Sequence, residues 1–305
     1  MKTKIIVILI LTIVLADFTG CSKKTADLRH GMNRNVCKRL AGKTVLYVIF
    51  VDTKTTKPWT GFDIRSTLDS LKLATNWIQN QAMLDGKSVN FQLDYFHFGD
   101  AYTISKELPK KMLYESINTF GNQGSKKINA WANAVSKKAL VAFPETTTFE
   151  KLLLPPNRDP NKPLKPNDTE KLIIAVKEKY KGDNVAICFM LNNYYKNDIS
   201  LNMNMLSDMT PEYFINSYKN PTLISQQLLN LFGALNFYKS PEDEKMSAIN
   251  NELIEKNYPN EVMLMQENKH LSGLIISPVT QYLLGWTNTV DHKYTKIFKH
   301  ELEKK

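Results

Sequence analysis

Three features of the sequence predict an α/β fold. Residues 44–51 form a continuous apolar run, rich in β-branched and aromatic side chains, which is typical of a strand buried on both faces. From Phe62 to Gly86, apolar residues recur at helical spacing. Residues 89–97 then alternate apolar and polar side chains, which indicates a half-buried strand. A strand, a helix and a second strand of these lengths predict an α/β unit.

The N-terminus has the pattern of a processing signal, so it does not enter the fold prediction. Lys2 and Lys4 precede an apolar run, residues 5–16, that is shorter than the roughly 20 residues a membrane-spanning helix needs. The residues that follow, Phe-Thr-Gly-Cys at 18–21, resemble the lipobox of bacterial lipoproteins, although Phe18 stands where Leu or Val is usual. The alternatives are an ordinary secretory signal and an uncleaved anchor helix.

The lipoprotein resemblance implies both a modification and a location. It implies that residues 1–20 are removed and that Cys21 is acylated, with palmitate among the acyl chains, which would hold the protein at a membrane. By resemblance to the sorting rules of such proteins, Ser22 implies the outer membrane of a Gram-negative envelope, and no acidic run follows that would signal surface export. We therefore expect a lipid-anchored envelope protein that faces the periplasm.

Beyond the signal, we expect a polar, basic tether at 21–43 and a single domain at 44–305. The formal charge of +10 falls by one when residues 1–20 are removed. Such a balance favours anionic partners, namely membrane surfaces, acidic glycans or acidic proteins. An envelope location argues against nucleic acid. The lysines are scattered along the chain, which favours a solvated surface over a dedicated patch.

Two cysteines remain besides Cys21. The periplasm permits a disulfide between Cys37 and Cys188, but Cys188 lies in the apolar run 185–191, where a buried free thiol is more common. Both alternatives stay open, because two cysteines alone do not fix the geometry of a disulfide.

The later part of the chain continues the α/β pattern around a proline-rich insertion. Five prolines between residues 154 and 168 exclude a helix or a central strand there. We expect an exposed loop, with a domain boundary as the alternative. Helices are predicted at 108–119, 125–141 and 169–181, and strands at 185–192 and 213–216.

A further helix is predicted at about 222–233. Thr222 is the expected N-cap, because its side chain can accept from a backbone N–H of the first turn. Ile224, Leu228 and Leu231 form one buried stripe. Gly233 stands where the chain should leave the helix, a usual position for glycine.

The polar residues of this segment have the spacing of a metal-dependent peptidase helix, H-E-x-x-H-x-x-G-x-x-H/D. Gln226 and Asn230 occupy the two histidine positions, and they lie four residues apart on one face. Gln227 occupies the glutamate position, and Asn236 the position of the third ligand. Each of the four is a neutral carboxamide. The alternative interpretation is an ordinary amphipathic helix that carries Gln and Asn on its solvated face.

The segment resembles the metzincin clan of zinc peptidases, and more narrowly a bacterial branch whose helix has the approximate sequence HEILHLFGAxDLY. Residues 258–263 (Tyr-Pro-Asn-Glu-Val-Met) resemble the segment leading into the Met-turn of this clan, with Met263 as its methionine. Residues 276–278 and 283–286 resemble its closing helix, so the likeness extends over about residues 44–287. The residues that agree with the helix scaffold are Leu229, Leu231, Phe232, Gly233, Ala234 and Tyr238.

This resemblance implies a metzincin-like domain with a mixed, twisted sheet, an active-site-type helix at 222–233 and a C-terminal subdomain with a Met-turn-like segment. It also implies a loss of chemistry. Zinc is held by imidazole, thiolate or carboxylate, whereas carboxamide oxygens suit calcium in a cage of many oxygens better. Without the cation, bound water is not acidified, and Gln227 cannot accept a proton as a glutamate does. We therefore expect no catalytic residue, no metal and no cofactor.

Other sites are less favoured by the sequence. The Asn-rich stretch 192–204 matches no recognised calcium loop. The histidines have no spacing that pairs them with one another or with a suitable carboxylate; they are His30, His97, His270, His292 and His300.

The leading hypothesis is a catalytically inactive, metallopeptidase-like envelope lipoprotein that binds a peptide or protein through a retained cleft. Binding would use strand addition at an edge strand, expected at 185–191. One rival hypothesis is an active hydrolase with an unrecognised site, and another is a purely structural lipoprotein.

Overall fold

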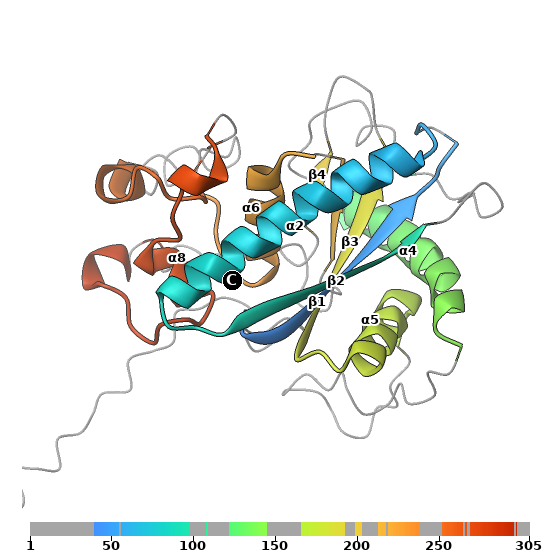
Figure 1. The fold of residues 1–305 in the computed structure, drawn as a ribbon, viewed down its shortest axis with the longest axis horizontal. Helices are drawn as coiled ribbons and strands as arrows, with labels where there is room; N and C mark the ends of the chain where they lie inside the picture. Colours follow the sequence, from blue (N-terminus) through green and yellow to red (C-terminus); the bar gives the residue numbers. More distant parts are fainter. Residues whose placement is uncertain are drawn as a thin grey trace, which may run out of the picture.

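Five strands form one mixed sheet in the order β2-β1-β3-β5-β4, and about six helices accompany it in an α/β fold (Figure 1). β1, β2, β3 and β5 run parallel, and β4 runs antiparallel to β5 at one edge. The strands are β1 (Gly42–Val51), β2 (Val89–His97), β3 (Asn184–Leu191), β4 (Ser200–Asn202) and β5 (Tyr213–Asn216). This computed structural model describes residues 40–54, 56–97, 108, 122–144, 166–192, 199–202, 213–217, 219–237, 252–264, 266, 269–295 and 297.

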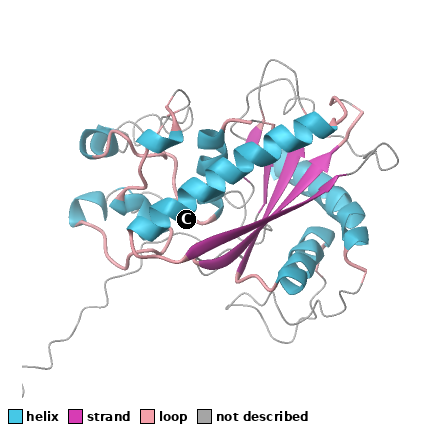
Figure 2. Cartoon of the chain, viewed as in Figure 1, coloured by secondary structure: helices cyan, strands magenta, loops and turns pink. Residues whose placement is uncertain are grey.

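Helices cover both faces of the sheet. Figure 2 shows α2 crossing one face, while α4 and α5 lie on the other. The helices are α2 (Gly61–Leu84), α4 (Asn122–Ala139), α5 (Asp168–Tyr180), α6 (Pro221–Leu231) and α8 (Pro278–Leu283), with short 3-10 turns η2 (Leu140–Ala142), η3 (Leu271–Gly273) and η4 (His292–Tyr294).

The strand β1 contributes to two apolar cores because successive side chains point to opposite faces. Leu46, Val48 and Phe50 pack with α2, α6 and the C-terminal segment. Val45 and Tyr47 belong to the core beneath α4 and α5. Burial on both faces explains why this strand has an uninterrupted apolar sequence.

Most of the predicted elements are confirmed. The helix from Phe62 is α2, the helix at 125–141 is α4 with η2, and the helix at 169–181 is α5. All four predicted strands are present. β1 begins two residues earlier than expected, so Gly42 and Lys43 belong to the sheet and not to the tether.

Several predictions concern residues outside the described part of the chain. These are the signal peptide with Cys21, the tether as far as residue 39, nearly all of the predicted helix 108–119, the loop from 154 to 165, and Tyr238. Among the residues that are described, no helix combines the length and the apolar character needed to cross a bilayer.

The sheet edges differ from the prediction. Residues 185–191 were expected to form an edge strand, and this is wrong: β3 lies between β1 and β5 and is buried throughout. Its unbroken apolar sequence suits a strand that packs on both faces of a sheet interior. The two edges are β2 and β4.

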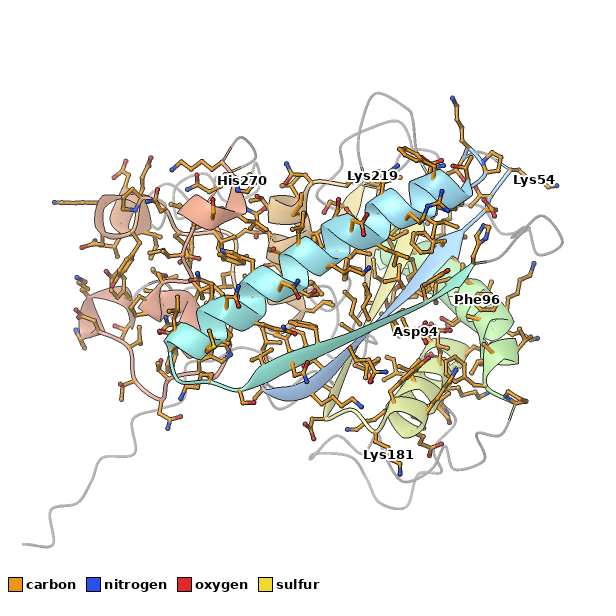
Figure 3. All side chains as sticks on the ribbon, viewed as in Figure 1. Lys54, Asp94, Phe96, Lys181, Lys219 and His270 are labelled. Carbon is orange, nitrogen blue, oxygen red and sulfur yellow. The ribbon has the colours of Figure 1, made fainter. Side chains whose placement is uncertain are left out.

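The outer edge of β2 is partly closed by side chains. The N–H groups of Phe91 and Tyr95 point away from β1, because the parallel register directs the N–H groups of even-numbered β2 residues toward it. Gln79 of α2 accepts from Phe91 N at 2.5 Å. Asp94, labelled in Figure 3, accepts from Tyr95 N at 2.7 Å. Such occupation reduces pairing with another chain at this edge.

Candidate functional site

The N-cap of α6 lies two residues before the position that the sequence suggested. Asn220 is its N-cap and accepts from Thr222 N at 2.8 Å, with Pro221 in the first helical position. The prediction that Thr222 is the N-cap is therefore wrong. Its hydroxyl instead donates to the carbonyl of Lys269 at 3.1 Å, which joins α6 to the C-terminal segment.

The end of α6 agrees with the prediction. The helix ends at Leu231, and Gly233 has φ 101°, a conformation that glycine adopts without steric strain. The predicted stripe of Ile224, Leu228 and Leu231 is fully buried. This turn returns the chain toward the side of α6 on which Asn230 lies.

The two amides at the histidine-like positions are buried. Gln226 is 4% exposed and Asn230 is 2% exposed. The alternative interpretation, in which these residues lie on a solvated helix face, is therefore wrong. Buried carboxamides require hydrogen-bond partners, since an unmade bond leaves a desolvated polar group.

Gln226 finds its partners 36 and 38 residues further along the chain. Its Nε2 donates to the carbonyl of Val262 at 2.6 Å and to the carbonyl of Leu264 at 2.9 Å. These carbonyls flank Met263, whose side chain is fully buried. One side chain thus ties α6 to the Met-turn-like segment on both sides of its methionine.

The loop after α6 joins the same arrangement. Asn230 Nδ2 donates to Asn236 Oδ1 at 3.1 Å, so the second and third ligand-like positions are in contact. The next residue, Phe237, donates its N–H to the carbonyl of Met263 at 3.0 Å. Gln227 is half-buried beside them on α6. We refer to Gln226, Asn230 and Asn236 as the amide cluster.

A buried carboxylate also holds the turn at Met263. The sequence analysis did not identify this residue. Glu261 is fully buried, and its Oε1 accepts from Met263 N at 3.1 Å and from Thr280 Oγ1 at 3.0 Å. Its Oε2 accepts from Ser277 N at 2.5 Å. Burial raises the pKa of this carboxyl above its ordinary value of 4.5, and the hydrogen bonds from Ser277, Met263 and Thr280 act in the opposite direction. The sequence signal was a glutamate directly before the apolar pair 262–263.

A second group of polar side chains lies at the carboxyl ends of β1 and β2. It shows a histidine paired with a carboxylate, which the spacing in the sequence did not indicate. His97 Nε2 lies 3.1 Å from Asp52 Oδ2, although the two residues are 45 positions apart. Asp52 also accepts from Trp59 N at 2.9 Å. Nearby on α2, Asp63 forms an ion pair with Lys219 at 3.1 Å; Figure 3 labels Lys219 beside this helix. Polar residues directly after buried strands could have indicated this group, because parallel strands end at one edge of the sheet.

The amide cluster can donate and accept hydrogen bonds, but it cannot accept a proton at neutral pH or supply a charged ligand. Within the described ranges, no three His, Cys, Asp or Glu side chains are grouped as a metal site. Cys188 is a buried free thiol whose pKa is raised by burial. Cys37, its candidate disulfide partner, lies outside the described residues, and so does most of the Asn-rich stretch 192–204.

Comparison with known protein families gives no match, and comparison with curated protein sequences also gives none. The fold and the amide cluster are therefore the basis for any functional inference.

The bridge formed by Gln226 can be tested with two substitutions of similar size. Gln226→Met removes the donor and leaves the carbonyls of Val262 and Leu264 unsatisfied, so we expect a loss of on the order of 1–3 kcal/mol in the free energy of unfolding. Gln226→Glu directs a carboxylate at the same carbonyls and should destabilise the protein more at pH 7. Urea denaturation measures both. Equal stability of the wild type and Gln226→Glu would contradict this bridge.

The burial of Glu261 predicts a pH dependence of stability. Because its folded-state pKa is raised, its contribution is most favourable below the unfolded value of 4.5 and is lost as pH rises through the folded pKa. Glu261→Gln cannot titrate and should lack this component. We expect the difference in unfolding free energy between the wild type and Glu261→Gln to change in this direction between acidic and neutral pH. A constant difference across that range would show that burial does not control Glu261.

Proposed function

We propose that this protein is a catalytically inactive, metzincin-like envelope lipoprotein that binds an extended peptide or protein segment. The proposal combines the lipobox-like sequence at Cys21 with the amide cluster. Its function would be recognition without cleavage, by a domain that keeps the outline of a peptidase but lacks its metal ligands and base.

The observation that carries the proposal is the contact of the amide cluster with the turn at Met263. The resemblance assigned Gln226, Asn230 and Asn236 to ligand positions and Met263 to the turn beneath the metal. Asn230 contacts Asn236, and Gln226 hydrogen-bonds on both sides of Met263. The segment 226–236 and the segment 262–264 are therefore in contact although they are distant in sequence, and this contact, with the mixed sheet, supports the proposal.

The substitution of amides for ligands supports the absence of peptidase chemistry. A zinc peptidase needs the cation to acidify its water and a carboxylate to accept the proton. The side chains of Gln226, Gln227, Asn230 and Asn236 supply neither, since a carboxamide is uncharged and has no basic site at neutral pH.

Peptide binding is supported by the position of β4 at an edge of the described sheet. Ser217 N donates to the carbonyl of Ile199, so Ile199 and, two residues later, Leu201 direct their backbone groups toward β5. The N–H and C=O groups of Ser200 therefore point to the outer edge, where no described strand pairs with them. β4 is in contact with α6, the helix that carries Gln226 and Asn230. An extended peptide could add there as a further strand.

The metal-site geometry is tested by restoring the four residues of a zinc peptidase. We expect the variant Gln226→His, Gln227→Glu, Asn230→His and Asn236→Asp to bind zinc, because three ligands would then converge above Met263. Elemental analysis after dialysis measures the bound metal, and the wild type should retain none.

The control is the double variant Gln227→Glu and Asn236→Asp, which adds the same carboxylates but no imidazole and should not retain zinc. A folded quadruple variant that ignores zinc would refute the proposed geometry. Chelator-sensitive peptide cleavage by the wild-type protein would refute the proposed lack of catalysis.

The edge of β4 is tested with Ser200→Pro. Proline removes the outward N–H without touching the hydrogen bonds to β5, a position at which edge strands tolerate it. We expect peptides that bind the wild type on a peptide array to lose affinity by about tenfold or more, the equivalent of one strong backbone hydrogen bond. Ser200→Ala keeps the N–H and should bind as the wild type does. Unchanged binding by Ser200→Pro would exclude strand addition at β4.

A further inference from the structure

The C-terminal end of α2 carries exposed apolar side chains that no described residue covers. Met83 is 68% exposed and Leu84 is 76% exposed. Ile275, which is 40% exposed, adjoins them because Ile276 N donates to Gln81 Oε1 in the last turn of α2. Lys87 follows and is exposed as well. We call Met83, Leu84, Ile275 and Lys87 the α2-end patch.

The chain enters the domain beside this patch. Gly42, at the start of β1, donates its N–H to the carbonyl of Ser88 at 2.8 Å, four residues after Leu84. Leu40 is fixed in place by Trp286, whose Nε1 donates to the Leu40 carbonyl at 2.7 Å. In Figure 1 β1 starts and α2 ends on the left of the sheet, toward α8.

The connection between this entry point and Cys21 is short and basic. Leu40 lies 19 positions after Cys21. A flexible chain of that length has a root-mean-square span of roughly 24 Å, which is less than the length of α2, whose 24 residues extend about 36 Å. Its charge suits an anionic lipid surface: the basic residues are Lys23, Lys24, Arg29, Arg34, Lys38 and Arg39, against one acid, Asp27.

We infer that the α2-end patch is the membrane-contacting surface of the domain, and that Met83 and Leu84 insert among the lipid headgroups. The inference rests on the proposed lipid anchor at Cys21. A short tether keeps the entry point close to the bilayer, and among the described residues the exposed apolar side chains of the patch adjoin that point through the contact of Gly42 with Ser88. Apolar side chains beside basic ones bind at such an interface, since the former enter the acyl boundary and the latter attract anionic lipids.

The patch itself is close to neutral, because Lys87 and Asp85 are both exposed there, so the attraction to anionic lipids would come from the basic residues between Cys21 and Leu40. Asp85 accepts from Gln281 Nε2 at 2.6 Å, and partial burial raises its pKa above the ordinary value. Docking by this end would leave the opposite end of the sheet, where β1 and β3 terminate, directed away from the bilayer toward soluble ligands.

The test uses the acylated full-length protein in vesicles of phosphatidylethanolamine and phosphatidylglycerol, with brominated acyl chains as quenchers of tryptophan fluorescence. Leu84→Trp places a probe in the patch. Phe62→Trp is the matched control: Phe62 is 72% exposed on the same helix, and 22 residues of helix separate it from Leu84 by about 33 Å. The native Trp59, Trp77, Trp131 and Trp286 are all buried.

We expect roughly half of the emission of the added tryptophan in Leu84→Trp to be quenched, as for a side chain buried at the headgroup boundary. Emission from Phe62→Trp should be unchanged. Met83→Trp is a second probe of the patch and should behave as Leu84→Trp does. Three results would overturn this orientation if the protein still floats with the vesicles. They are quenching of the probes at both ends of α2, quenching of Phe62→Trp alone, and quenching of none of the probes. Failure to float would instead refute the lipid anchor, and this inference with it.

Discussion

The hydrogen bonds from Gln226 to the carbonyls of Val262 and Leu264 are the constraint on which the C-terminal half of the structure depends. They join α6 to the turn at Met263. Glu261 holds the same turn through hydrogen bonds from Met263, Ser277 and Thr280. Each of these groups is buried, so leaving any of them unpaired would be costly, and the pairing therefore selects one arrangement of the three segments.

In the proposed interpretation, amides do the structural work that a metal does in an active peptidase. A cation holds its ligands through charge, whereas Gln226 and Asn230 satisfy backbone and side-chain oxygens with neutral donors. Neutral hydrogen bonds avoid the desolvation penalty of a buried charge. Under this proposal the outline of the site persists without its chemistry, and the edge at β4 would take the peptide.

The elements were predictable where a local pattern is enough to specify them. The continuous apolar run of β1, the helical spacing of α2 and the glycine after α6 each depend on neighbours in sequence. The predictions were wrong where contacts between residues far apart in the sequence determine the structure. One alternative placed the polar face of α6 in solvent. Gln226 is instead buried, and its hydrogen-bond partners are carbonyls 36 and 38 residues away. The pairing of His97 with Asp52 was missed for the same reason.

The sequence by itself determined which segments are helices and strands, and that the peptidase-like positions carry amides and not ionisable groups. Only the tertiary structure decided that β3 is internal, that β4 is an edge of the described sheet, and that Asn230, Asn236 and Met263 are neighbours. Periodicity reports how one segment is buried, because side-chain direction follows from local backbone geometry. It does not report which strand or turn supplies the covering surface, since that depends on contacts between residues far apart in the chain.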